Sequence, residues 1–270
     1  MGDILGRGKC PLFVIGGPCV IESLELCLSI ARSVKASCEK LGLAYIFKAS
    51  FDKANRSSKD SFRGPGLVEG VKILEKVKRE VGVPVLTDIH EAGQAAEAAR
   101  VVDVLQVPAF LARQTDLLQA CGKTGRWINV KKGQFMSPAE MANAIEKIKS
   151  AGNEKIILTE RGTFFGYNRL VNDFTGLAVM KELGCPVVFD ITHSTQQPAG
   201  MGTQSGGNPQ YSPMLARAAL AAGVDGLFLE CHPDPRNAKS DAATMMDLKD
   251  VEPLLKECKG IAELRKTWKS

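Results

Sequence analysis

The 270-residue chain lacks the features that mark several large classes of protein. No apolar run approaches the roughly 20 residues that a membrane-spanning helix needs. The short, charged and glycine-rich start, residues 1–9, has no apolar signal-peptide core. Internal repeats, low-complexity tracts and domain linkers are also missing. These absences predict a cytoplasmic protein with no membrane segment and a single domain that spans residues 1–270.

A disulfide framework and clustered charge are absent as well. The eight cysteines form no Cys-x-x-Cys pair and follow no spacing typical of a disulfide-bonded domain. Without a signal segment a reduced compartment is expected, where most cysteines would serve as small core hydrophobes. The net charge is only +5, and acids interrupt the lysine-rich segment 72–80. Because nucleic-acid binders concentrate their cations on one stripe, we expect no nucleic-acid partner.

The chain does contain eight short apolar runs, most of them rich in valine, isoleucine, leucine or phenylalanine. None alternates cleanly between apolar and polar residues, which indicates strands buried on both faces. The predicted strands are residues 12–15, 44–48, 85–87, 104–107, 128–130, 156–159, 187–190 and 226–230. Helical patterns lie between most of them and after the last, near residues 24–41, 66–81, 93–99, 115–122, 138–151, 170–183, 213–222 and 251–258.

Strands that alternate with helices in this way predict an α/β fold of the (β/α)₈ TIM barrel type. A doubly wound open sheet is the alternative, but it would usually carry a glycine-rich dinucleotide turn after its first strand. Gly16-Gly17-Pro18-Cys19 does not have that pattern. In a barrel the active site lies at the carboxyl ends of the strands, so residues at those ends are the candidates for chemistry.

Three of the strand ends would be neighbours in a closed barrel. The eighth strand must pair with the first and lie beside the seventh, which brings Cys19, His193 and Glu230 together. Asp241, in the loop after the eighth strand, can reach the same place. A thiolate, an imidazole and carboxylates suit a borderline divalent cation such as Zn²⁺ or Fe²⁺. The cysteine and histidine that directly follow Glu230 are rival ligands, although alternation puts that cysteine on the opposite face.

A second group of strand ends carries cations. Lys131 and Arg161 would end neighbouring strands, while Lys48 and Lys53 belong to the second strand and its loop. Several cations in one cavity would repel one another without an anionic ligand, so the pattern predicts a polyanionic small molecule. The loop 53–58 adds an amide, an arginine and two hydroxyls, which suit a phosphate and sugar hydroxyls.

One segment breaks the alternation of strands and helices. Residues 198–210 contain four glycines and two prolines and follow the seventh strand. Their number and composition indicate an active-site lid, with an ordinary surface connection as the alternative.

Several motifs spread over nearly the whole chain are specific enough to indicate a family. They are FKASFDKANRSS (47–58), PAFLARQTD (108–116), NVKKGQF (129–135), TERG (159–162), FGY (165–167), DITHS (190–194) and ECHPDP (230–235). These motifs closely resemble those of the 3-deoxy-D-manno-octulosonate 8-phosphate synthases. The resemblance implies condensation of phosphoenolpyruvate with D-arabinose 5-phosphate and water, with release of phosphate, for lipopolysaccharide biosynthesis. It also implies a (β/α)₈ barrel and a homotetramer.

The resemblance also assigns substrate-binding residues. Those implied for phosphoenolpyruvate are Lys48, Ser50, Lys53, Gln106, Lys131 and Arg161. Those implied for the sugar phosphate or for the loop and walls around it are Asn55, Arg56, Ser57, Phe110, Gln196 and Ser205. Arg113, with the two residues after it, would be lent to the site of a neighbouring subunit.

The family contains a metal-dependent and a metal-free branch, and this chain resembles the former. The metal-free branch carries Asn where this chain has Cys19, and it tends to have Cys and Gly around the residue that matches Asp241. The implied ligands of the divalent ion are Cys19, His193, Glu230 and Asp241, the same four that barrel closure gathers. Zn²⁺, Fe²⁺ and Mn²⁺ all suit this set.

The chemistry implied by the family sets three tasks for the protein. It must align two anions, stabilise charge at C2 and at the aldehyde oxygen, and position the attacking water. Lys53, His193 and Asp241 are expected to contribute to these tasks. Asp88 and His90 are expected either to relay protons or to support their neighbours.

Three other activities compete with this interpretation. The nearest is 3-deoxy-D-arabino-heptulosonate 7-phosphate synthase, which uses erythrose 4-phosphate. Its sugar-phosphate loop usually reads Lys-Pro-Arg-Thr-Ser, whereas this chain has Ala54-Asn55 in place of the proline. A Schiff-base aldolase could use Lys48 or Lys131 as its nucleophile. The last alternative is a barrel that binds sugar phosphates without catalysis.

Overall fold

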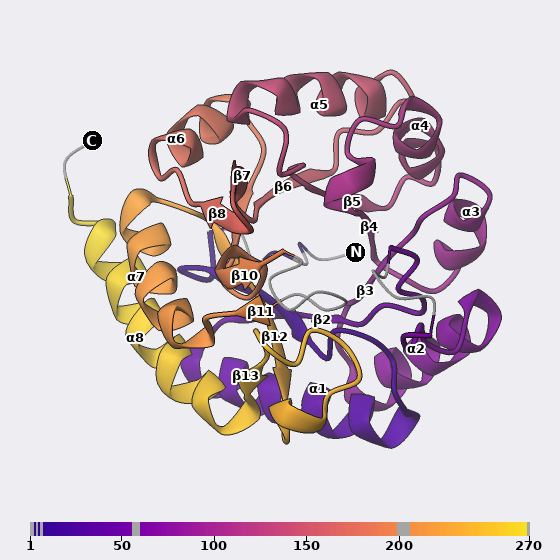
Figure 1. The fold of residues 1–270 in the computed structure, drawn as a ribbon, viewed down its shortest axis with the longest axis horizontal. Helices are drawn as coiled ribbons and strands as arrows, with labels where there is room; N and C mark the ends of the chain where they lie inside the picture. Colours follow the sequence, from indigo (N-terminus) through magenta and orange to yellow (C-terminus); the bar gives the residue numbers. More distant parts are fainter. Residues whose placement is uncertain (1–2, 4, 6–7, 56–59, 199–205, 269–270) are drawn as a thin grey trace.

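The computed structural model describes residues 3, 5, 8–55, 60–198 and 206–268, and these fold into the predicted closed barrel of eight parallel strands (Figure 1). In barrel order the strands are β1 (Phe13–Gly17), β2 (Ala44–Lys48), β3 (Val85–Asp88), β4 (Val104–Val107), β5 (Trp127–Lys131), β6 (Ile156–Glu160), β9 (Val187–Asp190) and β12 (Gly226–His232). β12 pairs in parallel with β1 and thereby closes the cylinder.

A ring of helices surrounds the barrel (Figure 1). They are α1 (Leu24–Leu41), α2 (Leu67–Val81), α3 (Gln94–Ala98), α4 (Thr115–Lys123), α5 (Met141–Lys149), α6 (Thr175–Glu182), α7 (Ser212–Ala222) and α8 (Val251–Arg265). α1 shows why they begin and end where they do. The Ser23 hydroxyl accepts a hydrogen bond from the Leu26 amide at 3.1 Å, and Gly42, at φ 66°, ends the helix. No helix in the described ranges is long and apolar enough to cross a membrane.

The predicted helix 170–183 is wrong in its first part. Its opening residues belong to a hairpin of β7 (Thr163–Gly166) and β8 (Arg169–Val171), and α6 begins only at Thr175. Tyr167 and Asn168, at φ 52° and 57°, form the tight turn. Paired left-handed residues of this kind match the twist of an antiparallel hairpin. The spacing of apolar residues carries no trace of that turn, which is why it predicts a continuous helix.

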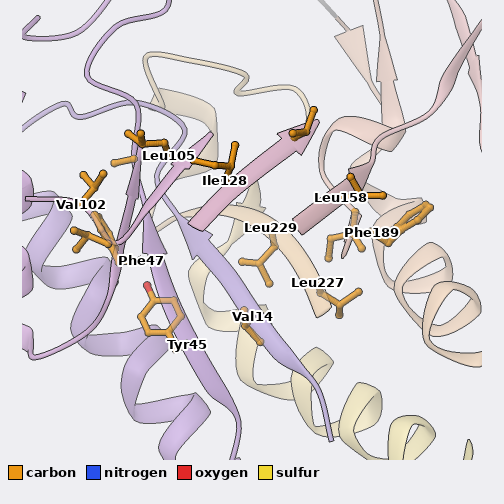
Figure 2. Packing of buried hydrophobic residues seen from close by; sticks show 14 of the residues in the cluster. Val14, Tyr45, Phe47, Val102, Leu105, Ile128, Leu158, Phe189, Leu227 and Leu229 are labelled. Carbon is orange, nitrogen blue, oxygen red and sulfur yellow. The ribbon is translucent and has the colours of Figure 1, made fainter. Parts of the chain in front are cut away.

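Alternating side chains along the strands build two separate apolar layers. Those that point into the barrel are Phe13, Ile15, Ile46, Leu86, Val104, Ile157, Val188 and Phe228. Those that pack outward against the helices include Val14, Tyr45, Phe47, Leu105, Ile128, Leu158, Phe189, Leu227 and Leu229 (Figure 2). Because both faces of each strand are buried in apolar surroundings, the strands read in sequence as apolar runs without alternation.

The inward positions change from apolar to polar toward the carboxyl ends of the strands. Along β12 Phe228 is followed on the same face by Glu230, and along β3 Leu86 is followed by Asp88. Leu5 joins the same inner apolar cluster as Phe13, the first residue of β1. Apolar packing therefore fills one end of the barrel, and a polar site is built at the other.

Gly17 lies where β1 and β2 approach each other at the polar end. A Cβ atom at this position would lie 2.1 Å from the carbonyl oxygen of Lys48, so only glycine fits without moving a strand. Beyond this point Val20 forms a parallel bridge with Ser50. The close approach sets Cys19 directly beside the end of β2.

Candidate active site

A cavity of about 820 Å³ opens at the polar end of the barrel. Its walls come from strand ends and from the loops that follow them. The predicted site residues that line it are Lys48, Lys53, Asn55, Asp88, His90, Gln106, Phe110, Lys131, Arg161, His193, Gln196 and Asp241. Its volume and position are those of a small-molecule site in a barrel of this type.

Cys19, Glu230 and Asp241 gather beside this cavity, with one ligand atom from each lying within 4.8 Å of the others. The Cys19 thiol donates to Asp241 Oδ2 at 3.0 Å, and its sulfur lies 2.9 Å from Ser240 Oγ. Glu230 Oε2 is buried and has no hydrogen-bond partner among the described residues. An unpaired buried carboxylate oxygen is costly, and beside a thiol and a second carboxylate it forms a donor set that fits a borderline divalent cation.

His193 lies next to this group. Its Nε2 is 3.6 Å from both Glu230 Oε2 and Asp241 Oδ2. Its other ring nitrogen, Nδ1, is 2.7 Å from Asp190 Oδ2. A carboxylate on one ring nitrogen fixes the ring so that the other nitrogen is directed at a ligand. The structure therefore brings the four predicted metal ligands to one place: Cys19, Glu230 and Asp241 lie within 4.8 Å of one another, and His193 lies 3.6 Å from the two carboxylates.

Burial and the nearby carboxylates shape the protonation of this group. Burial, followed by the charges of Asp241 and Glu230, raises the pKa of the Cys19 thiol well above its usual 9.0. Burial lowers the pKa of His193, but Asp190 and Glu230 outweigh it, so this pKa lies above the usual 6.5. The protein alone thus keeps Cys19 as a neutral thiol, and the thiolate requires a cationic partner.

The two residues after Glu230, the rival ligands, point elsewhere. Cys231 belongs to the outer apolar layer between barrel and helices, as alternation predicts. His232 Nδ1 accepts a hydrogen bond from the Asp234 amide at 2.9 Å, and its Nε2 lies 3.8 Å from Glu22 Oε1. Strand alternation therefore separates Cys231 from the ligand group correctly, and His232 is engaged in the loop that follows β12.

Lys48, at the end of β2, is buried with three partners for its ammonium group. Its Nζ donates to Glu230 Oε1 at 2.8 Å, to the Cys19 carbonyl oxygen at 2.9 Å and to Ser50 Oγ at 3.1 Å. Lys48 therefore connects the cationic side chains of the cavity with the predicted metal ligands Cys19 and Glu230. Loss of either charge of the Lys48–Glu230 pair would leave the other buried without compensation.

Lys131 and Arg161 follow one another around the barrel on β5 and just after β6. Lys131 Nζ donates to Asp190 and lies 3.3 Å from the centroid of the Phe228 ring. Arg161 Nη2 donates to Gln196 Oε1 at 2.6 Å, while its Nη1 is buried without a partner in the part of the chain that the structure describes. A buried guanidinium donor that lacks an acceptor, on a residue that lines a cavity, is a position for an anionic ligand.

A hydrogen-bonded chain runs from Ser50 through Asp88 to His90. Ser50 Oγ donates to Asp88 Oδ1, and Asp88 Oδ2 lies 3.1 Å from His90 Nε2. Burial raises the pKa of Asp88, but the hydrogen bond with His90 and the charge of Lys48 together lower it by more than burial raises it. The carboxyl group therefore stays ionised. This geometry does not decide between the two predicted roles, proton relay and support of neighbouring side chains.

A few predicted residues do not reach the cavity or lie outside the described residues. Arg113 is exposed and lines a separate hollow of about 420 Å³ formed mainly by α5 and the loop before α4. Arg56, Ser57 and Ser205 fall outside the described residues. Most of the predicted lid, residues 199–205, does so too, while the segments on either side pair as the short strands β10 (Gln196–Gln197) and β11 (Gly206–Gly207).

Comparison with known proteins places this barrel in a family. The family model described as the DAHP synthetase I family matches residues 3–267. The chain belongs to this family. Similar curated proteins carry the name 2-dehydro-3-deoxyphosphooctonate aldolase. One from Thioalkalivibrio sulfidiphilus is 56% identical over 256 residues, covering 95% of this chain and 91% of that protein. Those from Synechococcus sp. and Xylella fastidiosa are 55% and 58% identical, covering 97% and 91% of this chain and 93% and 89% of the respective protein.

One residue of this family site, Asp190, received no role from the sequence. Its Oδ2 accepts from Lys131 and contacts His193, and its Oδ1 accepts from the Thr192 and His193 amides at 3.0 and 2.8 Å. Burial raises the pKa of Asp190, but His193 and Lys131 lower it more, so the carboxyl group is ionised. Asp190 is the last residue of the seventh predicted strand, a position that marks it as a candidate site residue. On sequence alone, the role at this strand end is assigned to the nearby His193 instead.

Proposed function

We propose that this chain is a metal-dependent 2-dehydro-3-deoxyphosphooctonate aldolase. It condenses phosphoenolpyruvate with D-arabinose 5-phosphate and water, and it releases 3-deoxy-D-manno-octulosonate 8-phosphate and phosphate for lipopolysaccharide biosynthesis. Identity of 55–56% to proteins of that name over 95–97% of the chain supports the activity. The observation that carries the mechanism is one cavity lined by Lys48, Lys131 and Arg161, in which Arg161 Nη1 has no hydrogen-bond partner among the described residues, with a thiol and two carboxylates beside it.

Phosphoenolpyruvate would lie against the cations of the neighbouring strands. Arg161 offers its unpartnered Nη1, and Lys131 offers an ammonium on the same wall. The other groups proposed to hold it are Lys48, Ser50, Lys53 and Gln106. The sugar phosphate would bind at the loop that follows β2, held by Asn55, Arg56 and Ser57. Phe110, Gln196 and Ser205 are proposed as its further contacts.

C3 of phosphoenolpyruvate bonds to the aldehyde carbon as the C2–C3 double bond and the aldehyde C=O double bond each become single, and the aldehyde oxygen takes up a proton to become a hydroxyl. The oxygen of water bonds to C2 with loss of a proton. The bond between C2 and the phosphate oxygen then breaks, phosphate leaves, and the C2 hydroxyl loses its proton to become the ketone of the product. Lys53, whose ammonium lines the cavity, would stabilise the developing aldehyde oxyanion, and the ionised Asp88 would favour positive charge at C2. The Asp88–His90 pair would take the proton of the attacking water.

The metal part of the proposal assigns Cys19, His193, Glu230 and Asp241 to a divalent ion, Zn²⁺, Fe²⁺ or Mn²⁺. Their mutual distances and the unpaired Glu230 Oε2 support it. When bound, such an ion would supply Lewis acidity for polarising the aldehyde or the water. Lys48 and Asp190 would hold Glu230 and His193 in place from behind.

A homotetramer is also part of the proposal. Arg113 is exposed and away from the cavity of its own chain, which suits a residue that reaches the site of another subunit. Sedimentation of the purified protein would measure the number of subunits.

A phosphate-release assay with phosphoenolpyruvate and either sugar phosphate tests the activity. The five-carbon arabinose 5-phosphate should turn over, and the four-carbon erythrose 4-phosphate should be a poor substrate. Faster turnover with erythrose 4-phosphate would establish the heptulosonate activity instead. The absence of phosphate release with both sugars and added Zn²⁺, Fe²⁺ or Mn²⁺ would favour a non-catalytic barrel.

Arg56→Ala should weaken the sugar phosphate specifically. The loss of a charge-assisted hydrogen bond to phosphate costs about 1.5–3 kcal/mol, which corresponds to a rise of roughly 10- to 150-fold in the KM for arabinose 5-phosphate. Arg79→Ala, an exposed arginine on α2, is the matched control and should change neither KM. If Arg56→Ala raises the KM for phosphoenolpyruvate and spares that of the sugar, the loop has been assigned to the wrong substrate.

Lys131 should set an upper pH limit on phosphoenolpyruvate binding. Burial lowers the pKa of Lys131 from 10.5 to about 8, with Asp190 acting in the opposite direction. The cation is present below about pH 8 and lost above it, so kcat/KM for phosphoenolpyruvate should fall roughly tenfold per pH unit beyond that point. Lys131→Arg should move the fall to higher pH because a guanidinium stays charged. A profile of the native protein that is flat well above pH 8 would contradict this role.

A further inference from the structure

Gln196 connects a cationic side chain of the cavity, Arg161, with a proposed metal ligand, Asp241. It lies at the start of β10, half-buried, where the chain leaves the end of β9. Its Oε1 accepts a hydrogen bond from Arg161 Nη2 at 2.6 Å. Its Nε2 donates to Asp241 Oδ1 at 3.4 Å. One amide side chain therefore bridges a residue proposed to hold phosphoenolpyruvate and a residue proposed to bind the metal.

The orientation of this amide is dictated by Arg161. A guanidinium carries donors only, so Gln196 must present its oxygen to Arg161 and its NH₂ group to Asp241. That NH₂ group engages Asp241 Oδ1, which leaves Oδ2 directed at Cys19 Sγ, 3.0 Å away, and at His193 Nε2, 3.6 Å away. Arg161 Nη1 stays open, so an anion can bind there without releasing the amide.

The backbone of Asp241 has a conformation that such support favours. Its φ of 50° lies in the left-handed region, which is accessible to aspartate but less favourable than the right-handed region. The side chain is also part-exposed, so the barrel core does not fix its rotamer. Within the described ranges, the hydrogen bond from Gln196 is the one on the Oδ1 side, and it selects which oxygen faces the metal donors.

We propose that Gln196 is a positioning residue through which Arg161 aims the Asp241 carboxylate at the metal site. The inference rests on the proposed metal site and adds to it a link between anion binding and metal binding. The link predicts that Gln196 and Arg161 affect metal affinity as one unit, although neither offers a metal ligand.

The test is a titration of the metal-stripped full-length protein with Co²⁺, followed by the thiolate-to-cobalt absorption that Cys19 would give. Gln196→Met should weaken Co²⁺ binding by about 3- to 10-fold, the loss of one net hydrogen bond that orients a ligand. Gln197→Met, a change in the exposed neighbour on the same strand, should leave Co²⁺ affinity as it is. Equal losses in the two variants would overturn the proposal, since they would reflect a disturbed β10.

A double-mutant cycle separates positioning from the direct field of the Arg161 charge. In an Arg161→Met background, Gln196→Met should change Co²⁺ affinity by less than about 2-fold, because without Arg161 the Gln196 amide is no longer held in the orientation that positions Asp241. If Gln196→Met has the same effect with and without Arg161, Gln196 acts independently of it and the proposal fails.

A Cys19→Ala variant distinguishes failure of the proposed metal site from failure of the proposed role of Gln196. If this variant binds Co²⁺ as the native protein does, the metal site itself is wrong. If Cys19→Ala abolishes the thiolate absorption while the cycle is additive, the metal site stands and only the role of Gln196 is refuted.

Discussion

Removal of divalent metal by a strong chelator is expected to abolish turnover, and stoichiometric Zn²⁺, Fe²⁺ or Mn²⁺ is expected to restore it. The buried Glu230 Oε2 has no hydrogen-bond partner in the described part of the chain, and it lies beside a thiol and the Asp241 carboxylate. Lewis-acid stabilisation contributes several kcal/mol, so stripped protein should lose roughly a thousandfold or more in kcat. Phosphate release and metal content, measured on the same sample before and after treatment, check this.

Cys19→Ala should reproduce the effect of the chelator without any chelator present. Loss of the thiolate removes the softest donor of the set, so the variant should purify with little metal and show the same drop in kcat. Cys185→Ala, a half-buried cysteine beyond α6, is the matched control and should retain both metal and activity. Full activity of rigorously metal-stripped native protein would place this chain in the metal-free branch of the family.

Arg161→Met is expected to lower kcat/KM for phosphoenolpyruvate by about two to four orders of magnitude. The side chain can offer two charge-assisted bonds to an anion, each contributing about 1.5–3 kcal/mol. Nη2 already donates to Gln196, but Nη1 has no hydrogen-bond partner among the described residues and can serve an anion. Initial rates at varied phosphoenolpyruvate and saturating sugar phosphate give the number.

Two further variants sharpen the test of Arg161. Arg161→Lys keeps the charge but loses the planar fork, so it should fall between the native protein and Arg161→Met. Arg169→Met, on the exposed face of the β7–β8 hairpin, should be close to native. A KM for phosphoenolpyruvate that is unchanged in Arg161→Met would mean that the anion lies elsewhere in the cavity.

The barrel could be predicted because its strands carry a local signal. Val14 and Ile15 face opposite sides of β1 and are both apolar, since one layer fills the barrel and the other packs on the helices. Once closure is assumed, the meeting of Cys19 with Glu230 follows, because β1 and β12 pair with Gly17 opposite Glu230. The sequence therefore predicts this part of the candidate site, the proximity of Cys19 and Glu230.

Other features gave little or no local signal. The β7–β8 hairpin depends on two left-handed residues, Tyr167 and Asn168, and of these only Asn168 is of a type that favours turns. Leu5, which lies outside the strands, joins the inner apolar layer. The charge pairing of Lys131 with Asp190 joins strands that are not adjacent along the chain. Contacts of this kind depend on side-chain reach across the barrel, which spacing along a chain does not encode.

The amino-acid sequence by itself determined which residues end each strand and what chemistry they offer, because burial on both faces and the reactive strand ends are properties of short segments. The tertiary structure alone decided which of those groups are already paired and which are left open. Lys48 is satisfied by Glu230, whereas Arg161 Nη1 and Glu230 Oε2 have no hydrogen-bond partner within the described ranges. Pairing inside a closed barrel is a competition among several charges for a few partners, and only their positions in space settle it.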